Sequence, residues 1–141
     1  MTNFNLLFFK KEIQHENKTP PAVTFRMSWQ IDYYSEAVEE NILNLPDGLL
    51  ARYLKLSDLM LELGANLGMP HTKALHDGLF ELRIKAKEGI ARTFYCTQVG
   101  KRIIVLHVFV KKTQKIPTKE LKIAIERLKE VSKNDTSRTK S

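Results

Sequence analysis

Residues 78–115 read GLFELRIKAKEGIARTFYCTQVGKRIIVLHVFVKKTQK, and this stretch decides the fold. It divides into three β-strands, which the turns at residues 87–89 and at Gly100 separate. In the first strand, apolar and charged residues alternate, which is typical of a strand with one buried face and one solvated face. The apolar residues are Phe80, Leu82, Ile84 and Ala86, and the charged residues are Glu81, Arg83, Lys85 and Lys87.

The two following strands differ in their patterns. Residues 90–97 alternate less clearly, with Arg92 on one side and Tyr95 on the other. Residues 102–110 are apolar at almost every position, and His107 interrupts the run. A strand that is apolar on both faces is expected in the centre of a sheet. We expect His107 to be a hydrogen-bonded residue of the core or its rim, with a catalytic role as the alternative.

Positive charge is concentrated in this stretch. Between residues 83 and 115 there are nine lysines and arginines and one acidic residue, Glu88, while the whole 141-residue chain has a net charge of +7. The rest of the chain is therefore almost neutral. A basic sheet on a near-neutral body favours a polyanionic partner such as nucleic acid, an acidic protein or an anionic membrane. The plainer alternative is a solvated basic surface that binds none of these.

The segment before the sheet predicts a strand and a helical hairpin. Residues 28–34 alternate like a strand. Ser35 is placed to cap a helix over residues 36–45, which Pro46 ends, and residues 47–63 carry the wide apolar stripe of a second helix. Two helices with so short a connection pack antiparallel to each other.

The remaining segments complete a single α+β domain over residues 27–131. We expect a surface loop over residues 66–78 and a C-terminal helix over residues 118–131. Residues 132–141 are polar without periodicity and predict a disordered tail, and residues 1–26 predict an extension or arm. The order β-α-α-β-β-β-α predicts a mainly antiparallel sheet whose helices lie on one face, leaving the other face to Arg83 and its neighbours.

Composition favours a cytoplasmic protein without a membrane partner. The single cysteine, Cys96, excludes an internal disulfide and fits a small buried side chain. No apolar run approaches the length of a membrane span, and the apolar cluster near the N-terminus is too short for a secretory signal. The four histidines and Cys96 have no metal-ligand spacing, and no cofactor motif is present, so we expect neither a metal nor a cofactor.

The basic strands suggest phosphate chemistry. Arginine and lysine bind phosphates and stabilise the additional negative charge of a pentavalent phosphorus transition state. RNA supplies its own nucleophile, the 2′-OH, so a protein that holds the phosphate and moves protons can cleave it. Glu81 shares a strand face with Arg83 and is a candidate for proton transfer. Tyr95 and Phe109 are candidate stacking platforms for bases, and by default core residues. His71 and His76 lie in the predicted loop, where we expect exposed or structural roles.

Three strings in order resemble the phage-derived HigB-like toxins of the RelE/ParE superfamily. They are LHDGLFELR at residues 75–83, RTFY at residues 92–95 and LHVFVKKTQKIP at residues 106–117. The resemblance covers roughly residues 27–129. It implies a RelE-like fold, with a twisted antiparallel sheet behind an N-terminal helical hairpin.

The resemblance also implies a function. It indicates the toxin of a type II toxin–antitoxin pair, which cleaves messenger RNA in the ribosomal decoding site and is neutralised by a helix-turn-helix, HigA-like antitoxin. It implies that Arg83 and Arg92 bind and polarise the phosphate, and that Lys111 and Lys112 add cationic groups. The expected further RNA contacts are Lys85, Lys87, Tyr95, Phe109, Thr113 and Lys115.

The chain departs from the family pattern at the proton acceptor. Glu81 stands where the best-known RelE-type enzymes have a basic residue, and no tyrosine follows Lys112. Glu81 and His107 are therefore both kept as candidates for the general base. Two other functions stay open: a ParE-like inhibitor of DNA gyrase, and a non-catalytic basic module that binds an acidic partner. The KKTxKxP ending favours the HigB branch over the gyrase inhibitor.

Overall fold

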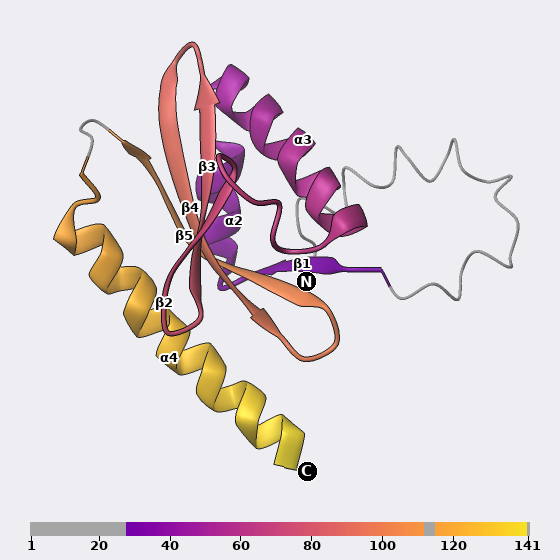
Figure 1. Cartoon of the computed structure of the whole chain (residues 1–141). Helices are drawn as coiled ribbons and strands as arrows, with labels where there is room; N and C mark the ends of the chain where they lie inside the picture. The colour runs from indigo at the N-terminus through magenta and orange to yellow at the C-terminus, as the bar shows by residue number, and fades with distance from the viewer. Residues whose placement is uncertain (1–27, 112–114, 141) are drawn as a thin grey trace, which may run out of the picture.

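The computed structural model describes residues 28–111 and 115–140, and it is shown in Figure 1. The expected arm at residues 1–26 and the expected site residues Lys112 and Thr113 lie outside the described part of the chain. The elements in chain order are β1 (Gln30–Tyr33), α2 (Glu36–Leu43), α3 (Asp47–Leu63), β2 (Thr72–His76), β3 (Leu79–Ala86), β4 (Gly89–Gln98), β5 (Arg102–Lys111) and α4 (Thr118–Lys140).

The strands form one five-stranded sheet in the order β1-β5-β4-β3-β2. β1 pairs with β5 in parallel, and every other pair is antiparallel. β5 lies inside the sheet between β1 and β4, as its two apolar faces require, although β4 holds the middle position. The predicted α+β, RelE-like fold is confirmed.

Helices cover both faces of the sheet, whereas we expected all of them on one face. α2 and α3 pack on the face that contains Leu82, Ile84 and Tyr95. α4 packs on the opposite face, where Ala124 and Leu128 bury their side chains. The prediction was wrong because β4 and β5 present apolar residues on both sides, and burying each large side chain contributes about 1.5–3 kcal/mol. Figure 1 shows α4 on the other side of the sheet from α3.

Two further elements differ from the prediction. The expected loop at residues 66–78 contains the edge strand β2, whose residues Thr72 and Lys73 pair with Leu82 and Glu81. Residues 132–140, for which we expected no regular structure, continue α4 to Lys140. No glycine or proline follows Pro117 in the sequence, so nothing there interrupts helical hydrogen bonding.

Two local contacts shape the helical hairpin: one caps α2, and the other holds α3 against the sheet. The Ser35 hydroxyl accepts a hydrogen bond from the Val38 amide at 3.3 Å, which is the predicted N-cap of α2. The Glu88 carboxylate, in the turn between β3 and β4, accepts a hydrogen bond from the Gly48 amide at 2.8 Å. A Cβ atom at Gly48 would lie 2.2 Å from that carboxylate, so a larger residue there would displace the Glu88 side chain from this contact. The turn that carries the basic strands is thereby held at the start of α3.

Among the described residues, no helix is both long and apolar enough to cross a membrane.

Candidate nucleic-acid interface

Strand register arranges the basic residues in three rows across β3, β4 and β5. Arg83 lies opposite Arg92, and Arg92 lies opposite Phe109. Cross-strand partners share one face of a sheet, so each row is a set of neighbouring side chains. The first row is Glu81, Phe94 and His107; the second is Arg83, Arg92 and Phe109; the third is Lys85, Ile90 and Lys111.

A β-bulge sets the composition of these rows. Phe94 pairs with His107 while the next residue, Tyr95, pairs with Val105, so Leu106 is an additional residue on β5. Leu106 lies in the cluster under α4, and the bulge brings His107 to that same face. Without the additional residue, His107 and Lys111 would change faces, because side chains alternate along a strand.

α4 packs over the first row. The second and third rows lie next to the helix and are not covered by it. Glu120, in the first turn of α4, lies 2.5 Å from the Nε2 atom of His107. The guanidinium of Arg127 donates a hydrogen bond to the Leu106 carbonyl at 2.7 Å. The His107 ring also stacks against the rings of Phe94 and Phe109, which contact each other. His107 is therefore a rim residue that connects the sheet to α4, as its position in an apolar strand suggested.

Glu81 forms an ion pair with Arg92. The side chain of Glu81 is 3% exposed and that of Arg92 is 13% exposed. Burial also lowers the pKa of the Arg92 guanidinium, because the charged form loses solvation. The ion pair offsets that cost and fixes the direction in which the guanidinium points. Glu81 thus holds Arg92 in place, and it lacks the open position that a general base needs.

Arg83 and Lys111 flank Arg92 without an ion pair of their own in the described part of the chain. The Nε atom of Arg83 and the Nζ atom of Lys111 are both buried with no hydrogen-bond partner. Burial lowers the pKa of Lys111 from its usual 10.5, and the charges of Arg92 and Arg83 lower it further. Three cationic groups with one buried carboxylate between them favour a bound anion.

The other predicted RNA contacts lie in different places. Lys85, Lys87 and Lys115 are exposed, and Phe109 is half-buried at the edge of the cationic rows. Tyr95 does not belong to this face: it is 1% exposed on the α3 side, and its hydroxyl donates to the Ala65 carbonyl at 2.6 Å. The expectation that Tyr95 stacks on a base is therefore wrong, because the side chain is part of the core.

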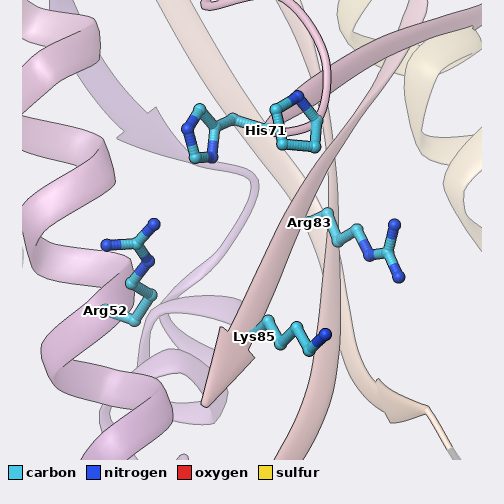
Figure 2. Close-up of a pocket in the computed structure, with 5 residues that line it drawn as sticks. Arg52, His71, Arg83 and Lys85 are labelled. Carbon is cyan, nitrogen blue, oxygen red and sulfur yellow. The ribbon is translucent and has the colours of Figure 1, made fainter.

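A pocket of about 230 Å³ extends the cationic surface around the edge of β3 (Figure 2). Arg52 of α3, Pro70, His71, Arg83 and Lys85 line it. Figure 2 shows Arg83 and Lys85 on the same side of β3, with Arg52 and His71 toward α3. No pattern in the sequence pointed to Arg52, and we expected His71 to be structural or exposed. Both residues reach the edge of β3 only through the fold.

No group of three or more histidine, cysteine, aspartate or glutamate side chains among the described residues is arranged to hold a metal ion. The acidic side chains near the cationic rows already have partners. Glu81 is paired with Arg92, and Glu120 is paired with His107. The surface offers cations and amines, which suit binding and proton transfer at a phosphate.

Residues 40–129 match the family described as Phage derived protein Gp49-like (DUF891). No curated protein matches the chain. The matched segment begins in α2, ends in α4 and includes all three rows and the pocket at β3. It spans more than half of the sequence. The chain therefore belongs to the Gp49-like family of phage-derived proteins, which is part of the RelE/HigB-like toxin family.

Proposed function

We propose that the protein is the toxin of a type II toxin–antitoxin pair and acts as a ribosome-dependent mRNA endonuclease. The observation that carries this proposal is the cationic surface of the second and third rows in a chain of a toxin family. Arg83, Arg92 and Lys111 lie together on one sheet face, and two of them lack any ion pair in the described structure. Such a surface suits a phosphodiester whose negative charge increases during the reaction.

In the proposed reaction, the 2′-OH of the RNA attacks the adjacent phosphorus and the 5′-oxygen leaves. Arg92, oriented by Glu81, and Arg83, which has free donors, bind the non-bridging oxygens. Because these guanidinium groups are fixed before substrate arrives, they stabilise the transition state without reorganisation. Metal-independent cleavage needs only a proton acceptor for the 2′-OH and a donor for the leaving oxygen.

We assign the role of proton acceptor to Lys111. Of the two candidates named from the sequence, Glu81 is engaged by Arg92 and His107 by Glu120. Lys111 has a buried Nζ atom without a hydrogen-bond partner, and its pKa is lowered by burial and by the two arginines. A lysine with a lowered pKa is neutral in a larger fraction of molecules near neutral pH, and a neutral amine accepts a proton.

The proposed partners are the ribosome with its mRNA and a cognate helix-turn-helix antitoxin. The ribosome supplies the positioned mRNA strand. The antitoxin neutralises the toxin until the antitoxin is degraded. An adjacent reading frame that encodes a small helix-turn-helix protein would support this pairing. Co-expression of that protein should restore growth to cells that express the toxin.

The substitution Arg83→Ala tests the proposed site. Mapping of mRNA ends on translating ribosomes should show cleavage by the native protein, and the variant should cleave roughly 10²–10³-fold more slowly because one transition-state cation is lost. Arg83 has no ion pair in the described structure, so the fold should persist in circular dichroism and thermal melting. Lys55→Ala, at an exposed position on α3, which packs on the other face of the sheet, is the matched control and should cleave at the native rate.

Two results would contradict the proposal. Native cleavage by Arg83→Ala would remove this surface from the reaction. Equal cleavage of naked and translated mRNA by the native protein would remove the dependence on the ribosome. Inhibition of gyrase supercoiling at stoichiometric protein, without any mRNA cleavage, would favour the ParE-like alternative.

A further inference from the structure

The pocket at the edge of β3 is a cationic cavity separate from the centre of the three rows. Its basic lining residues are Arg52, His71, Arg83 and Lys85, and none of its lining residues is acidic. Arg52 and Arg83 have no ion pair in the described part of the chain. Figure 2 shows Arg83 and Lys85 directed to one side of β3 and Arg52 and His71 on the side of α3. Cations on both sides of one strand edge, without a counterion, raise the local positive potential, which an anionic ligand would relieve.

The strand pairing explains why the cavity exists. β2 stops covering β3 at the pair Thr72–Leu82, and the Arg83 amide donates to the His71 carbonyl at 2.8 Å. Beyond that bond, β3 continues to Ala86 as the edge of the sheet. α3 lies alongside this edge and contributes Arg52, so the space is bounded by a helix, a loop and a strand.

Arg83 connects the pocket to the cationic rows. It lines the pocket, and it is also the cross-strand partner of Arg92. From Lys111 the cationic side chains continue through Arg92 to Arg83 and then around β3 to Arg52. A chain of phosphates is the ligand that matches a continuous line of cations. The volume of about 230 Å³ is below the roughly 300 Å³ at which pockets begin to hold drug-sized ligands. It therefore suits a single phosphate group with part of its ribose.

We infer that the pocket lined by Arg52, His71, Arg83 and Lys85 binds the RNA phosphodiester next to the scissile one. The inference rests on the proposed endonuclease function and adds to it a second phosphate site and the path of the strand across the sheet. The RNA crosses the sheet over Arg92 and leaves over the edge of β3 toward α3. Arg52 thus binds substrate at a distance from the reacting bond, and it sets how the strand is aligned.

A charge-coupling experiment tests this site. After the cleaved bond is mapped, ribosomes are programmed with mRNA that carries one neutral methylphosphonate at the phosphate 5′ or 3′ of that bond. For the native protein, one of these two substitutions should lower kcat/KM roughly 10–100-fold, as expected for a lost charge-assisted hydrogen bond. Arg52→Ala should cause a similar loss on unmodified mRNA and should abolish the effect of that methylphosphonate, because the two partners of one contact are not additive.

Lys55→Ala is the matched control. Lys55 lies on the same helix at an exposed position outside the pocket, so its removal changes the net charge equally. This variant should retain both the native rate on unmodified mRNA and the full methylphosphonate effect. Thermal melting of the Arg52→Ala and Arg52→Gln variants verifies that each is folded, and both should show the same loss of coupling.

The outcomes separate the two proposals. If the native protein cleaves mRNA but both methylphosphonates affect Arg52→Ala as they affect the native protein, the inference fails and the endonuclease proposal stands. If that result is accompanied by weaker binding of the antitoxin to Arg52→Ala, the pocket serves an acidic protein segment instead. If the native protein cleaves no mRNA in any context, the endonuclease proposal fails and the inference with it.

Discussion

The Lys111→Arg variant is expected to cleave mRNA on the order of 10²–10⁴-fold more slowly than the native protein, as for the loss of a general base. Arginine keeps the positive charge and the donors, but it does not deprotonate in proteins. Comparing the cleavage rates of Lys111→Arg and the native protein therefore separates proton transfer from phosphate binding. Both rates are measured as single-turnover mRNA cleavage on programmed ribosomes. Lys122→Arg, at an exposed position on α4, is the control and should leave the rate unchanged.

The pH dependence gives a second, independent measurement of the same role. The pKa of Lys111 lies below its usual 10.5 because of burial and the adjacent arginines, and the neutral form increases as the pH rises toward that pKa. Native cleavage should therefore rise with pH in the range below that pKa, by up to about tenfold per unit while the lysine is mostly protonated, and level off above it. Lys111→Arg should lack this rise. A native rate that is independent of pH across this range would exclude Lys111 as the proton acceptor.

The second large effect is on stability. Arg92→Ala leaves the Glu81 carboxylate buried and unpaired, and breaking a buried ion pair in this way costs about 3–5 kcal/mol. Urea denaturation should show this loss in the free energy of unfolding. The double variant Glu81→Gln/Arg92→Ala should recover part of it, because the amide carries no charge to desolvate.

The pair between Arg102 and Asp32 provides the control for that measurement. Its atoms are 2.7 Å apart, but its side chains are 25% and 23% exposed. Solvent screens such a pair, so Arg102→Ala should cost no more than about 1 kcal/mol. Equal losses for Arg92→Ala and Arg102→Ala would show that the Glu81 carboxylate is not held as the structure describes.

Much of the cationic surface was predictable from strand periodicity. The alternation in residues 79–86 placed Glu81, Arg83 and Lys85 on one face, and the register of β3 confirms it. The weaker alternation in β4 placed Arg92 on the side opposite Tyr95, which is also correct. These predictions succeeded because side-chain direction along a strand depends only on local backbone geometry.

The remaining features depend on contacts between distant segments. β5 is apolar on both faces, so its sequence contains no signal for the bulge at Leu106. The apolar stripe of α4 predicts that one side of the helix is buried, but it does not predict which face of the sheet the helix packs on. Arg52 and Arg83 line one pocket only because α3 lies along the edge that β2 leaves open. The roles of Glu81 and Lys111 likewise follow from distances and burial, which no spacing in the chain encodes.

The position of Cys96 gives the molecule a built-in chemical reporter. It is the single cysteine of the chain, it is 2% exposed, and it lies in the cluster that α4 covers. A thiol reagent can reach it only when that cluster opens, so the labelling rate measures how often α4 leaves the sheet. Alkylation kinetics, followed by mass spectrometry, therefore record opening of this helix on the unmodified protein, in the presence or absence of any ligand.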